Sequence, residues 1–166
     1  MLQQRFRFLS LIALLFITIQ SLSSCNFDNS YQDQKSIPEG KWNYNFQPEF
    51  EFEIKDPSVR HKVSLVIRHD EGYEFANIWV RLSLKYPYEK NYKPGTRIEA
   101  FLADNEGNWQ GKKSGSVIED VFILREGVDF PKLEKAGTYS IKLEQVMRQN
   151  PLISILNVGI RVEEMK

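Results

Sequence analysis

Three glutamates at alternating positions are the residues of this sequence best arranged for acid–base chemistry. Glu49, Glu51 and Glu53 lie two residues apart, which on a strand corresponds to about 6.6–7 Å, within the range that separates the two carboxyls of inverting glycoside hydrolases. The same spacing arises wherever a strand has one solvated face. No nucleophile elbow, phosphate loop or zinc signature accompanies it. We therefore interpret the row as a solvated face and expect the chain not to be an enzyme.

Residues that could bind a metal are few and poorly grouped. His61 and His69 are eight residues apart, with no cysteine near them, whereas a zinc site needs clustered ligands. Asp104–Asn108 places oxygen-bearing side chains around Gly107 but lacks the later bidentate glutamate of an EF-hand. We interpret the histidines as flanking strand ends and the acidic segment as a hairpin turn. Neither a metal nor a cofactor is expected.

Two tryptophans and an arginine are candidates for an interaction surface. Trp79 and Arg81 alternate with Ile78 and Val80, so they lie on the opposite face of their strand from the apolar residues. Either both faces of that strand are covered, with Trp79 buried beneath a loop, or an aromatic and cationic patch is exposed. Trp109 follows a glycine-containing turn and has the same two alternatives. Trp and Arg are favoured at the centres of interfaces, and an exposed Trp could also stack on sugar rings.

The single cysteine, Cys25, follows a segment with the layout of a secretory signal. Arg5 and Arg7 precede an apolar run from Leu9 to Leu22, which is shorter than the about 20 residues of a spanning helix. Leu22-Ser23-Ser24-Cys25 resembles the lipobox of bacterial lipoproteins, which implies cleavage before Cys25 and lipid attachment to its sulfur. A lone cysteine excludes an intramolecular disulfide. We expect Cys25 to be the membrane anchor.

The chain is accordingly divided into three parts. Residues 1–24 are the predicted lipoprotein signal peptide, residues 25–40 the lipidated cysteine with a flexible tether, and residues 41–166 one folded domain. Asn26 follows the cysteine in place of the aspartate associated with retention in the inner membrane, which favours the outer membrane. Lys and Arg together number 22, as do Asp and Glu. The chain therefore lacks the excess of positive charge that is typical of nucleic-acid-binding proteins.

Alternating apolar residues predict a domain made of strands. The clearest segment is residues 42–54, interrupted at Pro48, and comparable segments span 61–70, 74–87 and 153–164. Turn residues separate them, and no helical crossover of a dozen residues is present. The sequence therefore predicts an all-β, antiparallel β-sandwich, either jelly-roll or immunoglobulin-like.

Several motifs follow one another in a fixed order along the chain. They are the lipobox, Ser36-Ile37-Pro38 with Trp42, residues 73–78, residues 103–112, Gly137-Thr138-Tyr139, Gln145 with Met147-Arg148, and the segment 144–164 as a whole. This ordered set resembles the GldH gliding-motility lipoproteins of Bacteroidetes. The resemblance covers nearly the whole mature chain and departs mildly at Val146, where alanine is expected, and at Asn157, where aspartate is expected.

The resemblance implies a non-enzymatic envelope lipoprotein that is needed for surface gliding. That machinery is linked to the type IX secretion of surface adhesins. We expect a domain anchored at the outer membrane that acts as an interaction module for proteins of the gliding and secretion apparatus. The alternative is a lipid-anchored module that binds glycans. The family has no assigned catalytic residues.

Overall fold

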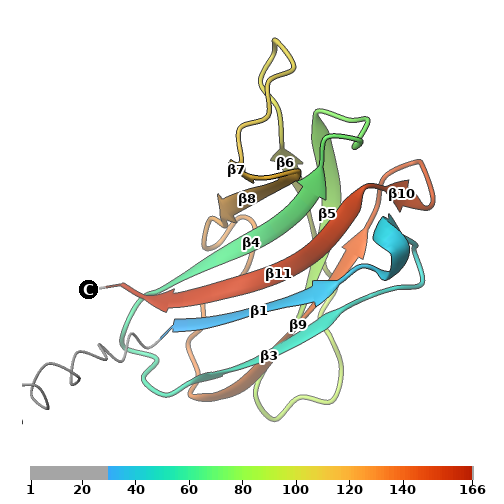
Figure 1. Ribbon diagram of the computed structural model, residues 1–166. Helices are drawn as coiled ribbons and strands as arrows, with labels where there is room; N and C mark the ends of the chain where they lie inside the picture. The colour runs from blue at the N-terminus through green and yellow to red at the C-terminus, as the bar shows by residue number, and fades with distance from the viewer. Residues whose placement is uncertain (1–29, 166) are drawn as a thin grey trace, which may run out of the picture.

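Residues 30–165 form two main antiparallel sheets and a short two-stranded one in the computed structural model, which describes this part of the chain (Figure 1). The predicted all-β sandwich is confirmed. No helix within residues 30–165 is long and apolar enough to cross a bilayer. The larger sheet has the strand order β1 (Ser30–Ser36), β11 (Ile155–Glu164), β4 (His61–Asp70), β8 (Val117–Ile123) and β7 (Lys112–Ser114). The smaller sheet has the order β3 (Glu49–Ile54), β9 (Gly137–Gln145), β5 (Asn77–Lys85) and β6 (Thr96–Phe101).

Two short strands and one turn close one end of the sandwich. β2 (Lys41–Trp42) pairs with β10 (Leu152–Ile153), and a 3-10 turn, η1 (Pro38–Gly40), connects β1 to β2. The predicted interruption at Pro48 is confirmed, because the chain turns between β2 and β3, and the two strands belong to different sheets. Trp42 is fully buried and donates its indole N–H to the carbonyl of Phe46 at 2.9 Å.

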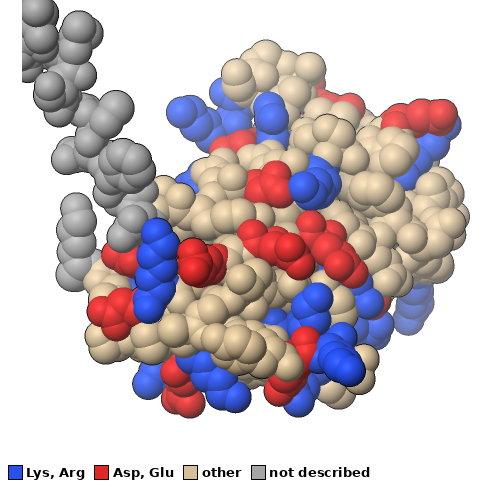
Figure 2. All heavy atoms as spheres, turned by 90° about the horizontal axis from the view of Figure 1, so that it is seen from below, with Lys and Arg blue, Asp and Glu red and all other residues tan. Residues whose placement is uncertain are grey.

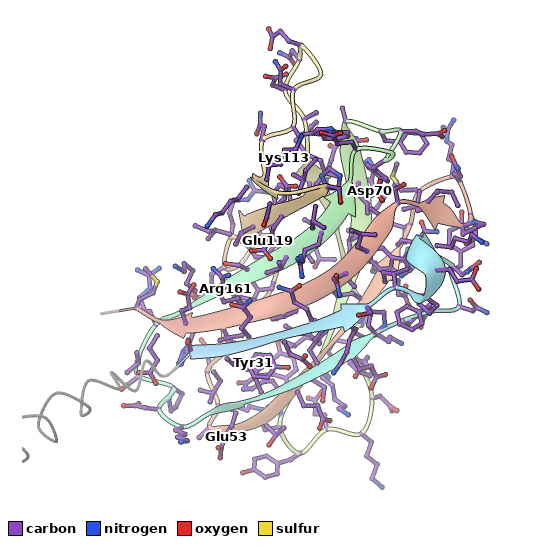
Figure 3. The ribbon with its side chains drawn as sticks, in the orientation of Figure 1. Tyr31, Glu53, Asp70, Lys113, Glu119 and Arg161 are labelled. Carbon is purple, nitrogen blue, oxygen red and sulfur yellow. The ribbon has the colours of Figure 1, made fainter. Side chains whose placement is uncertain are left out.

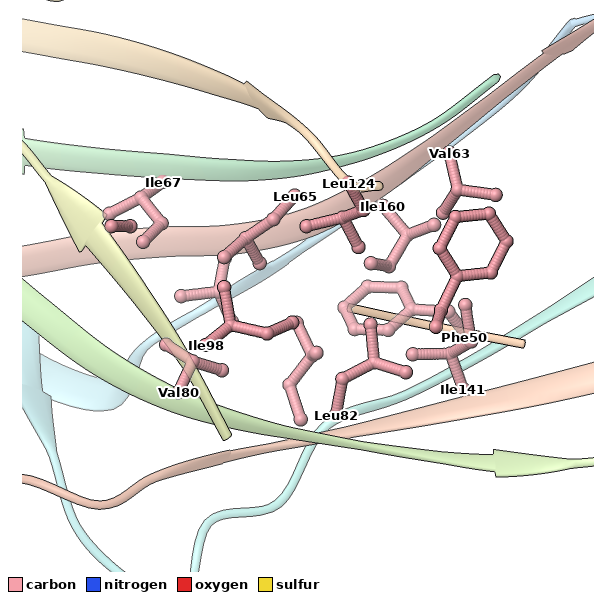
Figure 4. Packing of buried hydrophobic residues seen from close by; sticks show 14 of the residues in the cluster. Phe50, Val63, Leu65, Ile67, Val80, Leu82, Ile98, Leu124, Ile141 and Ile160 are labelled. Carbon is pink, nitrogen blue, oxygen red and sulfur yellow. The ribbon is translucent and has the colours of Figure 1, made fainter. Parts of the chain in front are cut away.

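The core fills the space between the two inner faces. Strands β4 and β11 contribute β-branched and leucine side chains that pack on aromatic and aliphatic residues of the smaller sheet (Figure 4). Along β3 the buried positions are Phe50, Phe52 and Ile54, and the exposed ones are the intervening glutamates. Alternation with period two is what places one set of side chains in the core and the other in water.

The predicted tether is partly wrong, because the domain begins before residue 41. Ser30–Ser36 pairs along its whole length with β11, from Ser30 opposite Glu163 to Ser36 opposite Asn157. Its sequence, SYQDQKS, has one apolar side chain, Tyr31, whose ring lies 5.7 Å from that of Phe52. Burial raises the pKa of the Tyr31 phenol to about 12. Backbone pairing rather than apolar alternation adds this strand to the sheet. Cys25 and the signal segment lie outside the described residues.

Candidate functional site

The row of glutamates lies on the outer face of the smaller sheet. Glu49, Glu51 and Glu53 are exposed, and Glu53 is labelled in Figure 3. Ser140 on the neighbouring strand donates its hydroxyl to Glu51 at 3.1 Å. None of the three glutamates lines any of the hollows described below. The interpretation as a solvated face is confirmed.

The two histidines occupy opposite ends of β4 and do not share a site. Ten residues at about 3.3 Å each separate the ends of that strand by roughly 30 Å. His69 is fully buried, with Nδ1 2.9 Å from the carbonyl oxygen of Asp70 and Nε2 3.2 Å from Oδ2 of Asp120. Within the described residues no group of three His, Cys, Asp or Glu side chains is placed to hold a metal ion.

Asp104–Asn108 is a hairpin turn in which the Asp104 carboxylate accepts hydrogen bonds from other residues of the same turn. Oδ1 of Asp104 accepts the backbone N–H groups of Glu106 at 3.0 Å and Asn108 at 2.7 Å, and Oδ2 accepts the Asn108 amide at 3.0 Å. These hydrogen bonds, chiefly those from Asn108, lower the pKa of the Asp104 carboxyl. The turn closes with Ala103 bridged to Trp109. It projects from the sandwich at the top of Figure 1.

The three residues expected to form one interaction surface take different roles. Trp109 is half-buried and packs against the edge of the His69 ring, with 4.6 Å between the ring centroids. Arg81 is exposed on the outer face of β5, where its guanidinium lies 3.0 Å from Glu144 on β9. Trp79 is half-buried on the same outer face. Its contacts are with Arg97 and Met147, which the sequence did not single out together.

Trp79 and Arg97 form the floor of a hollow of about 630 Å³. The guanidinium carbon of Arg97 lies 4.4 Å from the centroid of the Trp79 ring, a cation–π contact between neighbouring strands β5 and β6. We call this cavity the Trp79 hollow. Most of its lining lies in the segments 73–78 and 144–164, and its main side chains are Phe75, Trp79, Arg97, Met147, Arg148 and Gln149.

The loop of residues 146–149, which forms one wall of the hollow, is hydrogen-bonded to Trp79, Gln145 and Tyr44. Val146 donates its N–H to the Trp79 carbonyl at 2.9 Å, and the Trp79 N–H points at the Met147 sulfur at 3.2 Å. The buried Gln145 accepts the Met147 N–H at 3.0 Å. The hydroxyl of Tyr44 donates to the Met147 carbonyl at 2.7 Å. Because its backbone groups are paired, the loop presents Met147 and Arg148 from a fixed wall.

A second hollow, of about 640 Å³, shares Trp79 and Arg97 with the first. It lies where β6 and β8 form neighbouring edges of the two sheets, and exposed apolar side chains of Phe101, Val121 and Ile123 line it. β7 pairs with β8 only from Val117 to Glu119, so the outer side of the remaining β8 residues carries no strand within the described chain. We call this region the open edge.

Charges elsewhere on the surface are mixed. Figure 2 shows Lys and Arg interspersed with Asp and Glu over the face it presents, so that face carries no large field of one sign. Ion pairs on the surface include Lys62 with Glu163 at 2.9 Å and Lys93 with Glu89 at 3.1 Å.

Several solved structures are distantly similar to this chain. A carbohydrate-binding module specific for non-crystalline cellulose aligns at 13% identity with a TM-score of 0.39, covering 80% of this chain and 71% of that one. The infectious bursal disease virus VP2 subviral particle aligns at 10% identity with a TM-score of 0.36, covering 84% of this chain and 33% of that one. Both scores are below 0.5, and no functional inference rests on them.

Sequence comparison is more informative. A protein of Christiangramia forsetii (strain DSM 17595 / CGMCC 1.15422 / KT0803), named gliding motility lipoprotein GldH homolog, is 26% identical over 160 residues, which cover 92% of this chain and 94% of that protein. The sequence model of the GldH lipoprotein family matches residues 29–162, which include every strand of the sandwich except the last two residues of β11. The chain therefore belongs to the GldH lipoprotein family.

Proposed function

We propose that this lipoprotein is a non-catalytic interaction module of the gliding-motility machinery, anchored in the outer membrane through lipid on Cys25. In this proposal it docks on proteins of the apparatus that is linked to type IX secretion of surface adhesins. Family membership supports the association with gliding and with a lipid anchor. The outer membrane, the secretion link and the docking role are the further steps proposed.

The Trp79 hollow is the observation that carries the docking role. Trp, Phe, Met and Arg are the side chains enriched at protein interfaces, and this cavity gathers Phe75, Trp79, Met147 and two arginines. Its wall is fixed by backbone hydrogen bonds before any partner arrives. A preformed wall lowers the ordering cost that binding would otherwise incur.

The glycan-binding alternative has no comparable support. Trp42 is fully buried, Trp109 packs on His69, and Arg97 covers one face of the Trp79 ring. A sugar-stacking platform needs a free aromatic face. We therefore retain protein partners as the proposed ligands.

Photo-crosslinking in intact cells tests the docking role. A photoreactive phenylalanine analogue is placed at Gln149, on the rim of the Trp79 hollow, at Ile123, on the open edge, and at Gln32 on the outer face of the larger sheet. The proposal expects reproducible crosslinks to defined envelope proteins from Gln149 or Ile123, and fewer from Gln32. Absence of crosslinks from all three positions, in cells that glide normally, would contradict it.

A further inference from the structure

We propose that the Trp79 hollow binds an acidic peptide segment of a protein partner, and that Arg97 and Arg148 form ion pairs with a carboxylate of that segment. This inference rests on the proposed function, because it names the partner chemistry of the same surface. Two observations carry it: the lining of the hollow includes two arginines and no acidic residue, and neither arginine is ion-paired within the described residues.

Neither guanidinium group is ion-paired within residues 30–165, because neither Arg97 nor Arg148 lies within salt-bridge distance of a carboxylate there. By contrast, the nearby Arg81 is paired with Glu144 at 3.0 Å. Both free arginines are exposed, and both line the hollow. No Asp or Glu is among the residues that line it.

The acids that share the second hollow with Arg97 are engaged by other groups. Glu99 pairs with Trp79 in the register of β5 and β6 and accepts a hydrogen bond from the Asn77 amide. Asp129 is bound by Arg125 at 3.0 Å. Neither carboxylate forms an ion pair with Arg97 or Arg148 within residues 30–165.

Geometry favours a carboxylate on an extended peptide. The Arg97 guanidinium is held over the Trp79 ring by the cation–π contact, so it is oriented before binding. A planar guanidinium can donate two parallel hydrogen bonds to one carboxylate. Phe75 and Met147 lie beside the arginines and offer an apolar surface to a neighbouring side chain. An Asp or Glu flanked by an apolar residue satisfies both features.

Peptide titration tests the inference with a defined probe. The peptide acetyl-Leu-Glu-Phe-Asp-Leu-amide is titrated into the ¹⁵N-labelled domain, and its isosteric counterpart with Gln and Asn serves as the uncharged control. We expect shifts at the Trp79 indole and the Met147 amide with the acidic peptide, and at least tenfold weaker binding with the control peptide. Raising the salt concentration should weaken the acidic peptide's binding.

Substitution assigns the effect to the two arginines. The double variant Arg97→Gln, Arg148→Gln should weaken the acidic peptide by at least tenfold and bring it to the level of the amide control. Arg161→Gln is the matched control, because Arg161 lies on the other sheet and bonds to Gln32 at 2.9 Å (Figure 3). Unchanged acidic-peptide binding in the double variant, with a normal circular-dichroism spectrum, would overturn the assignment.

The crosslinking assay separates failure of this inference from failure of the proposed function. Loss of the Gln149 crosslinks in the double variant supports the inference. Crosslinks that persist at Gln149, or that arise only from Ile123, overturn the acidic-segment assignment and leave the interaction module standing. Binding of the domain to phosphatidylglycerol vesicles through the same arginines, with no peptide response, would also overturn it in favour of a lipid surface.

Discussion

His69 and Asp120 form a buried polar pair that connects β4 to β8. A carbonyl oxygen can only accept, so Nδ1 of His69 must carry a hydrogen toward the backbone of Asp70. The other ring nitrogen, Nε2, lies 3.2 Å from Oδ2 of Asp120. Gly111 lies against the same carboxylate, where an added Cβ would be 2.6 Å from Oδ2. One side-chain pair therefore holds both β8 and the segment that follows Trp109.

Replacing Asp120 with alanine should lower the free energy of unfolding by about 3 kcal/mol, because it leaves the His69 ring buried without its partner. Urea unfolding followed by circular dichroism measures the loss. Asp104→Ala is the control, since that acid lies in an exposed turn, and its effect should be smaller. An Asp120 variant as stable as the Asp104 variant would show that the pair contributes little.

The contact between Asp129 and Arg125 should make the stability of the folded domain depend on pH. Arg125 donates its side-chain Nε at 3.0 Å, its Nη2 at 3.0 Å and its backbone N–H at 2.8 Å to this carboxylate. The Arg125 side-chain bonds are the main reason that the pKa of Asp129 is lowered in the folded state. A lowered folded pKa contributes stability that is complete above the unfolded pKa, about 3.9, and disappears as pH falls through the folded value.

Asp129→Asn should therefore cost about 1 kcal/mol at pH 6, and the difference from the unmodified domain should shrink as pH falls below about 4. Unfolding curves in urea at pH 6 and at pH 2.5 measure the two differences. A gap that stays constant between these pH values would show that the Arg125 contact does not depend on the charge of Asp129.

At the scale of elements, the strands with alternating apolar residues could be predicted, and β1 could not. β3, β5 and β11 carry period-two patterns because each has one face in the core. β1 contributes mainly backbone pairing, and its register with β11 depends on a residue 120 or more positions away. Pairing between distant segments leaves no local signal in a single sequence.

The same limitation explains the partial prediction of the interaction surface. Trp79 and Arg97 each alternate with buried residues of their own strand, so their outward direction could be read from the sequence. Their contact depends on the register of β5 with β6, and Met147 reaches Trp79 from the loop after β9. The sequence groups Trp109 with Trp79 and Arg81 because it is a tryptophan next to a glycine-containing turn, whereas its ring packs on His69.

Gly159 permits β1 to approach β11 closely. A Cβ at this position would clash with the Asp33 carbonyl oxygen and lie 2.6 Å from Cγ of Gln34. Gly159→Ala should displace β1 at a cost of roughly 1–3 kcal/mol and speed hydrogen exchange of the amides from Ser30 to Ser36. The unmodified domain is the reference. Exchange rates that match it would mean that β1 accommodates the methyl group without moving.

At the scale of the whole molecule, β1 determines which end of the sandwich an anchor on Cys25 would hold. Five residue steps separate Cys25 from Ser30, so the start of β1 lies at most about 18 Å from Cys25. Ser30 pairs beside Glu163, and His61 pairs with Glu164, so these residues share one end (Figure 1). The other end carries Ser36, His69 and the loop that walls the Trp79 hollow.

Strand β11 connects the two ends over ten residues, about 33 Å. A lipid on Cys25 would therefore keep the β3–β4 turn near the bilayer and direct the Trp79 hollow away from it. Energy transfer tests this orientation. The lipidated protein is reconstituted into vesicles that contain a headgroup acceptor dye, with a donor attached at Ser58→Cys in that turn or at Gln149→Cys on the hollow.

Transfer should be clearly more efficient from position 58 than from position 149, because transfer falls steeply over the distance that β11 spans. The Cys25→Ser variant is the control for attachment and should give no transfer above background from either position. Equal transfer from the two positions would mean that the sandwich lies flat on the membrane. The Trp79 hollow would then face sideways, accessible to neighbours in the same leaflet, and its partner would have to be sought among membrane-bound proteins instead of proteins that approach from the periplasm or the cell exterior.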